Sequence, residues 1–339
     1  MSPADHISYS EIRTFERCKR LHWYTYELGW APKREEAPLA AGRIMHALLA
    51  RYYHPRGVSW YDECGELRSL ALDGAAFDEE RDAIRADFDL YFRVMERYQD
   101  HYPAEAWEPV YFEDAPLVER EIMVPLPSGT SLKIRVDLVA RDLDSGLIWV
   151  WDHKTKKEFD RDMEARLDFD PQLSIYTVGL RALGINVAGG LHNYLRMRLP
   201  AVPKINKDGT MSRVAITTDE DTVRGFIEQS GAKIPDDELD AYLAKLPQDA
   251  FFRRYMTIRE DHELMATAQD LEAKIQERAL ARQYGLMTRT LIRDCMFCPF
   301  YRPCLTALKG GDEELVLAEQ YIKKEEPVAL LDPVEGGES

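Results

Sequence analysis

The chain has 339 residues, 45% of them hydrophobic, and its 60 Asp and Glu exceed its 44 Lys and Arg to give a net charge of −16. This composition supplies enough apolar residues for one or two globular domains and excludes a wholly disordered chain. There is no run of about 18 apolar residues and no signal peptide, so we expect a cytoplasmic protein that does not enter a membrane.

The negative charge is distributed unevenly along the chain. Residues 311–339 hold nine acidic residues against two lysines, which predicts an acidic, flexible tail. Such a tail either recruits a partner, such as a helicase or a single-strand-binding protein, or only keeps the chain soluble. Two stretches are rich in basic residues and form either solvated faces or parts of a nucleic-acid groove: Arg13, Arg17, Lys19 and Arg20, and Arg196, Arg198, Lys204, Lys207 and Arg213.

The first predicted elements are helices. Ser8 and Glu11 form a capping box that predicts a helix from Ser8 to about Leu28. Helices are also expected over 39–53 and 77–101, the latter inside a long insertion at about 54–116 whose role the sequence leaves open. In the helix over 39–53, Gly42 is expected to permit close approach of a neighbouring element, and His46 four residues later is a candidate metal ligand or a structural histidine.

Three strand-like runs follow at 117–126, 131–140 and 147–154, separated by turn residues. A hairpin that pairs Asp142 with Leu147 also places Asp137 opposite Asp152. Like charges in directly opposed positions destabilise a sheet, and a divalent cation with oxygen ligands would offset the repulsion. Lys154 projects from the same face as Asp152 because side chains alternate along a strand.

Asp137, Asp152 and Lys154 around one cation are the parts needed for phosphodiester hydrolysis, since the metal polarises the phosphoryl oxygen and activates a bound water. The alternative is an exposed ladder whose charges simply face solvent. Glu119 and Glu121 are further possible ligands, although alternation leaves the direction of their side chains open.

Asp170 and Pro171 begin another helix, over 172–183. Gln172 and Tyr176 stand one turn apart on this helix. Their side chains either contact a phosphate or a base of the substrate, or Tyr176 packs in the core and Gln172 is an ordinary surface residue. A strand near 187–197 and helices near 219–230, 236–246 and 260–283 complete the expected elements.

Four of the five cysteines are grouped as Cys18 and, far along the chain, Cys295, Cys298 and Cys304. In a reducing compartment such spacing indicates metal ligands rather than disulfides. The spacing alone does not distinguish zinc from iron. Cys64 is expected to be a plain thiol.

Several motifs together resemble the RecB-type branch of the PD-(D/E)XK nuclease superfamily over about residues 7–305. They are G-x-x-x-H at Gly42–His46, the aspartate of IRVDLV at Asp137, D-x-K at Asp152–Lys154 and Q-x-x-x-Y at Gln172–Tyr176. The resemblance implies an α/β fold, a restriction-endonuclease-like mixed sheet flanked by helices, in one nuclease domain over 1–310. It implies metal ligation by His46, Asp137, Asp152 and the backbone carbonyl of His153, with Mg²⁺ or Mn²⁺ as the cation, a catalytic Lys154 and supporting roles for Gln172 and Tyr176.

The cysteine pattern is similar to the iron–sulfur subset of this superfamily, which includes AddB-type and CRISPR-associated adaptation nucleases. That similarity implies a structural [4Fe–4S] cluster on Cys18, Cys295, Cys298 and Cys304, with zinc as the less favoured occupant, so that the 295–304 segment closes the fold.

The resulting prediction is a metal-dependent DNA exonuclease that acts on single strands or DNA ends. One alternative is a nuclease subunit of a helicase–nuclease or CRISPR-adaptation complex, whose motor must be a partner because the chain has no G-x-x-x-x-G-K-[ST] phosphate loop. A second is a non-catalytic, zinc-stapled DNA-binding or scaffold protein. Recombination, phage replication and spacer acquisition all remain open as pathways.

Overall fold

The computed structural model describes residues 6–33, 37–55, 59–103, 105–207, 209–212, 214 and 216–323. The chain divides into two compact units: unit 1 is Met1–Ala40, Met123–Ile134 and Ala266–Ser339, and unit 2 is Ala41–Ile122 and Arg135–Met265. Strands β6 (Val118–Pro125) and β7 (Ser131–Asp142) contribute residues to both units. Arg213, part of the second basic stretch, lies outside the described residues.

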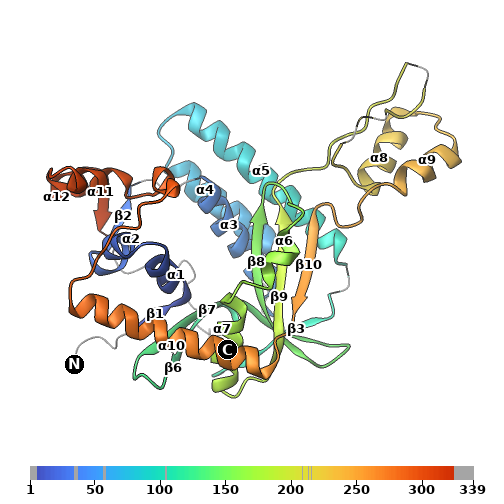
Figure 1. Ribbon diagram of the computed structural model, residues 1–339. Helices are drawn as coiled ribbons and strands as arrows, with labels where there is room; N and C mark the ends of the chain where they lie inside the picture. Colours follow the sequence, from blue (N-terminus) through green and yellow to red (C-terminus); the bar gives the residue numbers. More distant parts are fainter. Residues whose placement is uncertain are drawn as a thin grey trace, which may run out of the picture. The chain divides into compact units, whose positions relative to one another are not determined.

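The main sheet is mixed, as the sequence predicts. Its strands follow the order β1-β7-β8-β9-β10, and β3 and β6 also pair with β7. Strand β8 (Ile148–Lys156) is antiparallel to β7 and parallel to β9 (Val187–Arg196), which is antiparallel to β10 (Phe252–Thr257). Strands β8, β9 and β10 lie side by side in Figure 1. Strand β1 (His6–Ser8) pairs in parallel with the start of β7, and the short strand β3 (Trp107–Pro109) pairs with its end.

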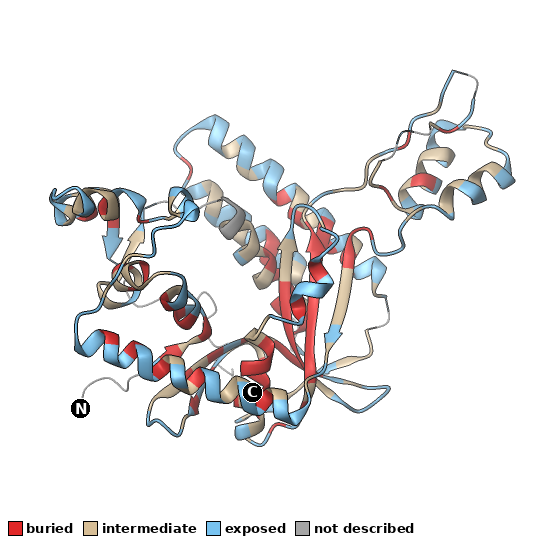
Figure 2. Cartoon of the chain, viewed as in Figure 1, coloured by how far each residue is buried: buried red, intermediate tan, exposed pale blue. Residues whose placement is uncertain are grey.

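Helices cover both faces of this sheet in unit 2. Alternate residues such as Trp149, Trp151 and Leu191 point into a core that they share with α3 (Ala37–Tyr53) and α5 (Asp78–His101). On the other face, α6 (Met163–Leu167) packs on β9 through Met163, Leu167 and Tyr194, and α7 (Gln172–Ala182) crosses β9 and β8. Strands β8 and β9 are therefore buried along most of their length, as Figure 2 shows.

Gly190 of β9 is required where α7 crosses the sheet. A Cβ added there would lie 2.7 Å from the Cβ of Leu173, which is too close for real atoms. Gly42 does not play the role expected of it, because a Cβ at that position meets only Thr155 Oγ1, at an ordinary 3.5 Å.

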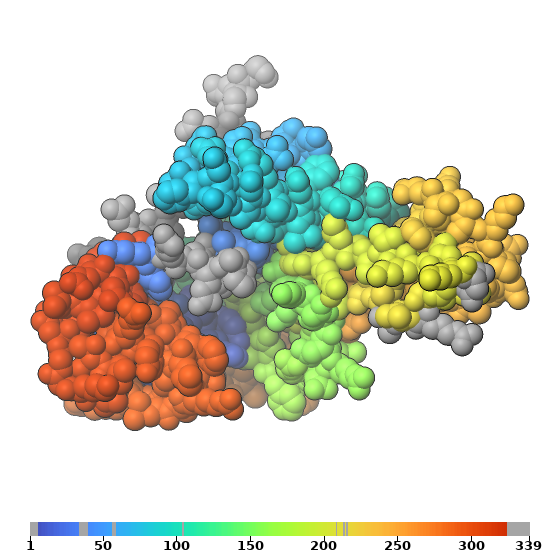
Figure 3. Space-filling view, turned by 90° about the horizontal axis from the view of Figure 1, so that it is seen from above, coloured from blue at the N-terminus to red at the C-terminus, as the bar shows by residue number. Residues whose placement is uncertain are grey.

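The insertion at 54–116 is built mainly from two paired helices. Helix α4 (Trp60–Asp73) packs along α5, and the two form a ridge in the space-filling view (Figure 3). A small hairpin of β4 (Tyr111–Phe112) and β5 (Ala115–Pro116) ends the insertion. Between β9 and β10 the chain forms α8 (Glu220–Ser230) and α9 (Asp236–Leu243). Among the described helices, none combines the length and apolar character needed to cross a membrane.

The first helix of unit 1 is not continuous, contrary to the prediction of a helix from Ser8 to Leu28. Helix α1 (Tyr9–Arg17) stops at Cys18, whose backbone is extended (φ −167°, ψ 117°), and the chain continues as α2 (Lys19–His22) and a π-helical turn (Trp23–Glu27). The capping box is half formed, because Ser8 Oγ accepts the N–H of Glu11 at 3.2 Å but the Glu11 carboxylate pairs with His22 and Arg278 instead.

Helix α10 (Asp261–Gln283) leads to the cysteine-rich segment at the end of the chain. A 3₁₀ turn (Arg293–Phe297), α11 (Tyr301–Leu308) and α12 (Glu313–Gln320) follow, and β11 (Tyr321–Lys323) pairs with β2 (Trp30–Pro32).

The sequence predicts a flexible tail from residue 311, but helix α12 and strand β11 lie beyond that residue. Asp312 caps α12, and the Glu313 carboxylate accepts hydrogen bonds from Arg20 and Tyr24. Tyr321 is buried and donates a hydrogen bond to the carbonyl of Pro299 at 2.7 Å. These contacts order the segment up to Lys323; the remaining tail, 324–339, lies outside the described residues.

Candidate metal centre and cysteine cavity

The β7–β8 hairpin has the register expected from its turn. Asp142 donates its N–H to the carbonyl of Leu147 at 2.9 Å, and the paired residues run from Arg141–Ile148 to Leu138–Trp151. One step further, at Asp137 and Asp152, the regular ladder ends. There Asp137 Oδ2 accepts the N–H of His153 at 2.7 Å, so a carboxylate replaces a backbone acceptor at this point of the sheet.

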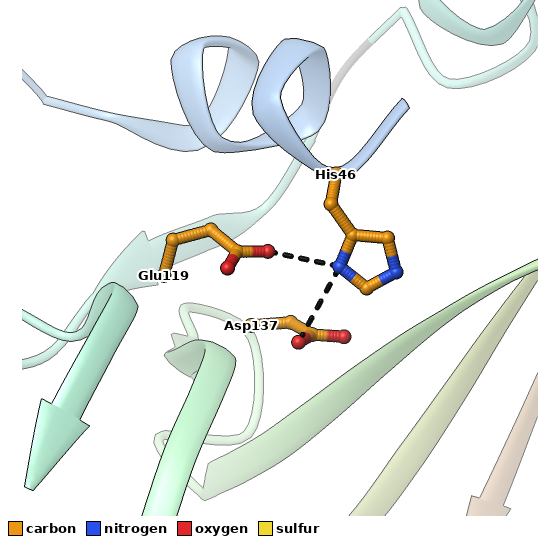
Figure 4. Close-up of side chains that lie close together, drawn as sticks. All are labelled: His46, Glu119 and Asp137. Carbon is orange, nitrogen blue, oxygen red and sulfur yellow. Dashed lines mark hydrogen bonds and ion pairs between the residues drawn. The ribbon is translucent and has the colours of Figure 1, made fainter. Parts of the chain in front are cut away.

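His46, Glu119 and Asp137 meet beside this end of the ladder (Figure 4). His46 Nδ1 lies 2.9 Å from Glu119 Oε1 and 3.5 Å from Asp137 Oδ1. Among the described residues, these are the three whose ligand atoms come within 4.8 Å of one another. Three elements supply them: helix α3, strand β6 and strand β7.

The other ring nitrogen of His46, Nε2, lies 2.9 Å from the backbone carbonyl of His153. Burial disfavours the charged imidazole, but Asp137 and Glu119 outweigh it and raise the pKa of His46 well above its usual value. Burial raises the pKa of Asp137. A protonated imidazole offsets only one of the two carboxylate charges, and a metal ion bound through its nitrogen would displace that proton.

Glu119 is the member that sequence reasoning left undecided. Alternation along β6 buries Ile122 and Val124 and exposes Glu121 and Met123, so an odd-numbered residue is expected to face solvent. Glu119 instead has a positive φ of 44°, an uncommon conformation for a residue with a Cβ. This kink turns its side chain inward to 5% exposure. Backbone strain of this kind is concentrated at functional sites.

Asp152 and Lys154 form a second group on β8. Lys154 Nζ donates to Asp152 Oδ1 at 2.8 Å, and Gln172 Nε2 donates to the same oxygen at 2.9 Å. Burial opposes ionisation of Asp152, but Lys154 and His192 outweigh it and lower its pKa to about 2. Burial opposes the charge on Lys154 too, but Asp152 raises its pKa. Both side chains are therefore ionised at neutral pH.

The start of α7 brings Gln172 to this group. Asp170 Oδ1 accepts the N–H of Gln172 at 3.0 Å, and the helix begins after Pro171, within one residue of the predicted start. Gln172 Oε1 also lies 3.4 Å from Lys154 Nζ. Tyr176 lies one turn further along α7 and is buried; its role stays a prediction.

His192 is a residue that the sequence analysis missed. It is the register partner of Asp152 on the parallel strand β9, and its Nδ1 lies 3.5 Å from Asp152 Oδ2. Both side chains are almost fully buried, and within the described part of the chain neither of these two atoms has a hydrogen-bond partner. The run LHNYLR does not by itself indicate this residue, because its contact with Asp152 depends on the pairing of β8 with β9.

The four grouped cysteines line one cavity in unit 1, of about 90 Å³. Cys18 lies at the break between α1 and α2, where its Sγ is 3.5 Å from the backbone N of Thr290. Cys295, Cys298 and Cys304 come from the 3₁₀ turn and α11, and Arg17, Arg20 and Arg289 also line the cavity. Cys64 is buried on α4 in unit 2, apart from this cavity, as the sequence predicts.

The spacing of the thiols bears on the kind of metal. Within the described part of the chain, no three cysteine sulfurs lie within 4.8 Å of one another. The sulfurs of a tetrahedral zinc site, with bonds of about 2.3 Å, lie about 3.8 Å apart. No three of the described thiols are therefore placed as in a closed zinc site.

The family model of the PD-(D/E)XK nuclease superfamily matches residues 6–304, which is most of the chain. None of the curated proteins compared with the chain matches it.

Proposed function

Because the chain belongs to the PD-(D/E)XK nuclease superfamily, we propose that it is a Mg²⁺- or Mn²⁺-dependent DNA nuclease that acts as an exonuclease on single strands or DNA ends. One observation carries the proposal. The group of His46, Glu119 and Asp137 lies at the end of the same hairpin that carries Asp152 and Lys154.

The donor atoms of this site suit a hard divalent cation. Glu119 and Asp137 offer carboxylate oxygens, His153 offers its carbonyl and His46 a ring nitrogen. Oxygen ligands suit Mg²⁺ and Mn²⁺, and an imidazole is accepted more readily by the transition metal. When bound, the cation supplies Lewis-acid polarisation of the phosphoryl oxygen and lowers the pKa of a bound water.

The chain's own side chains position the reacting groups. Asp137 accepts the N–H of His153 and so fixes the carbonyl of the same residue beside His46. Asp152 and Gln172 hold the ammonium of Lys154, which can donate to a phosphate oxygen or orient the attacking water. A charged donor fixed before the reaction stabilises developing negative charge without reorganisation.

A cleavage assay on end-labelled DNA tests this proposal. Lys154→Ala and Asp152→Ala should each lower the cleavage rate in Mg²⁺ or Mn²⁺ by about 10²-fold or more, whereas Lys233→Ala, an exposed lysine between α8 and α9, should cleave like wild type. Thermal unfolding of each variant confirms that it is folded. A circular single strand should resist an exonuclease, so its cleavage would point to an endonuclease instead. Wild-type protein that cleaves no DNA with either metal would refute the enzymatic proposal.

The second part of the proposal concerns the cysteine cavity, which we assign to a structural [4Fe–4S] cluster. Two observations support it: the four cysteines line one cavity, and no three of the described cysteine sulfurs lie as close together as in a closed zinc site. A cluster there joins Cys18 to residues 295–304, and closing so long a loop restricts the unfolded chain most.

Iron and sulfide analysis of anaerobically purified protein tests the cluster. Cys304→Ala should lose the iron and lower the midpoint of thermal unfolding, whereas Cys64→Ala should retain the iron because Cys64 lies outside the cavity. Zinc in place of iron would instead favour the zinc-stapled alternative.

A partner that binds through the tail would be lost on deleting residues 324–339, a truncation that leaves the ordered α12 and β11 intact.

A further inference from the structure

Three arginines gather at the end of β8, beyond Lys154, two of them on the carboxylate of Glu158 and one on the ring of Phe159. Arg196 donates to Glu158, and Arg198 Nη1 donates to Glu158 Oε1 at 2.8 Å. The guanidinium of Arg253 lies 4.9 Å from the centre of the Phe159 ring, and that of Arg196 lies 5.5 Å from it. The aromatic ring thus fixes two guanidinium groups in place.

The pairing of the strands places this arginine cluster on the face of the sheet that carries Lys154. Lys154 is the register partner of Tyr194, which is in turn the partner of Arg253 on β10. Lys156 is the partner of Arg196. Arg196 is thus offset from Lys154 by two residues along the strands, about 6.6 Å, and by one strand spacing of about 4.8 Å, together roughly 8 Å, a separation that the long lysine and arginine side chains can match to neighbouring phosphates of one nucleic-acid strand.

The cluster carries more positive than negative charge. Lys156 and Arg196 are directly opposed like charges, which destabilise a sheet unless something offsets them. Arg198 adds to them, while Glu158 is shared between two arginines. Arg253 has Asp249 as its own partner, at 3.0 Å.

The excess of positive charge matters most for Arg196, because its side chain is only 10% exposed. Burial, together with Arg198 and Arg253, lowers its pKa. Within the described residues, its Nε is buried without a hydrogen-bond partner. The donor that meets Glu158 is Nη2, and beside this excess of positive charge its position is suited to a bound anion.

From this arrangement, and on the basis of the proposed nuclease function, we propose that Arg196, Arg198 and Arg253 form a second phosphate-binding site for the DNA strand held at Lys154, which Glu158 occupies until DNA binds. A phosphodiester presents oxygens to the guanidinium groups much as a carboxylate does, and arginine suits both. Binding exchanges the Glu158 carboxylate for a backbone phosphate and leaves Glu158, which is half exposed, in water. The strand is then held at two adjacent phosphates.

DNA binding without cleavage tests the site, using a fluorescein-labelled single-stranded oligodeoxynucleotide, fluorescence anisotropy and EDTA over a series of salt concentrations. Arg198→Ala should weaken binding by roughly threefold to tenfold for any sequence and should reduce the slope of log K against log salt by about 0.7. Glu158→Gln should bind more tightly than wild type, because the competing carboxylate has lost its charge.

The matched controls are Arg224→Ala and Glu220→Gln, an ion pair on α8 with side chains 53% and 57% exposed, close to the 51% and 50% of Arg198 and Glu158. Both should bind DNA like wild type. An Arg198→Ala protein with the wild-type affinity and salt slope overturns the proposal. So does a folded Glu158→Gln protein that binds more weakly, because Glu158 would then only hold the arginines in place.

Two outcomes distinguish a failure of this phosphate-binding site from a failure of the proposed nuclease function. If the wild type cleaves no DNA but the variants bind as expected, the phosphate site stands and the nuclease proposal fails. If the wild type cleaves DNA but Arg198→Ala binds like wild type, the nuclease proposal stands and the phosphate site is overturned.

Discussion

Replacing Arg254 tests how much the buried ion pair behind β8 stabilises unit 2. Its guanidinium donates to Glu105, and to the hydroxyl groups of Tyr98 at 2.8 Å and Tyr53 at 3.0 Å. It also lies 3.5 Å from the centre of the Tyr102 ring. Asn193 continues the network towards the metal centre.

Arg254→Met keeps much of the apolar volume but leaves the carboxylate of Glu105, which is only 14% exposed, without its partner. Breaking a buried ion pair in this way costs about 3–5 kcal/mol. In a unit the size of unit 2, each kcal/mol lowers the unfolding midpoint by about 2–4 °C, so we expect a fall of about 6–20 °C. Glu105→Gln should cost less, because the amide still accepts a hydrogen bond.

The assay is urea unfolding of both single variants and of Arg254→Met/Glu105→Gln. The double variant should cost less than the sum of the single ones, because it removes both charges together. Costs that add to within about 0.5 kcal/mol would refute the reasoning, since they would show that the pair is not coupled. The exposed pair Arg224–Glu220 is the control, and its loss should change stability by less than about 1 kcal/mol.

Three further predictions concern single residues. Glu119→Gln removes one charge from the candidate metal centre and should lower the affinity for Mn²⁺ about 10- to 100-fold by titration calorimetry; unchanged affinity would show that Glu119 takes no part. Gly190→Ala forces Leu173 away from the sheet and should cost about 1–3 kcal/mol in urea unfolding, whereas Gly225→Ala, in open space on α8, should be neutral or stabilising. Burial disfavours the Glu313 carboxylate, but Arg20 and Tyr24 outweigh it and lower its pKa. The wild type should therefore unfold at a higher temperature than Glu313→Gln at neutral pH, and this difference should vanish as the pH falls below about 4; a difference that is constant with pH would contradict the ionic contribution.

The hairpin could be predicted because its signals are local. Turn residues at 142–146 fix which residues pair, and side chains alternate along both strands. The observed pairs from Arg141–Ile148 to Leu138–Trp151 confirm that register. The pairing rule does not predict that the ladder ends at Asp137, where the aspartate accepts the N–H of His153 in place of a backbone carbonyl.

Other parts of the site depend on information that is not local. Glu119 turns inward through one kinked residue, and alternation in β6 gives no sign of the kink. His192 reaches Asp152 only because β9 pairs in parallel with β8, and α6 and α7 separate the two strands in the sequence. The break at Cys18 is likewise invisible to helix signals, since the residues on both sides of it favour a helix and the extended conformation of Cys18 is set by its surroundings.

The cysteine cavity and the candidate metal centre belong to different units of the chain. All four grouped cysteines belong to unit 1, whereas His46, Glu119 and Asp137 belong to unit 2. Strand β7 is shared, because Ser131–Ile134 lies in unit 1 and Arg135–Asp142 in unit 2. Within unit 1, β1 pairs with Ser131, Leu132 and Lys133, and β1 leads directly into α1 and Cys18. Removing a ligand of the proposed cluster with Cys304→Ala should therefore lower the stability of the N-terminal segment and of the Ser131–Ile134 part of β7, both in unit 1.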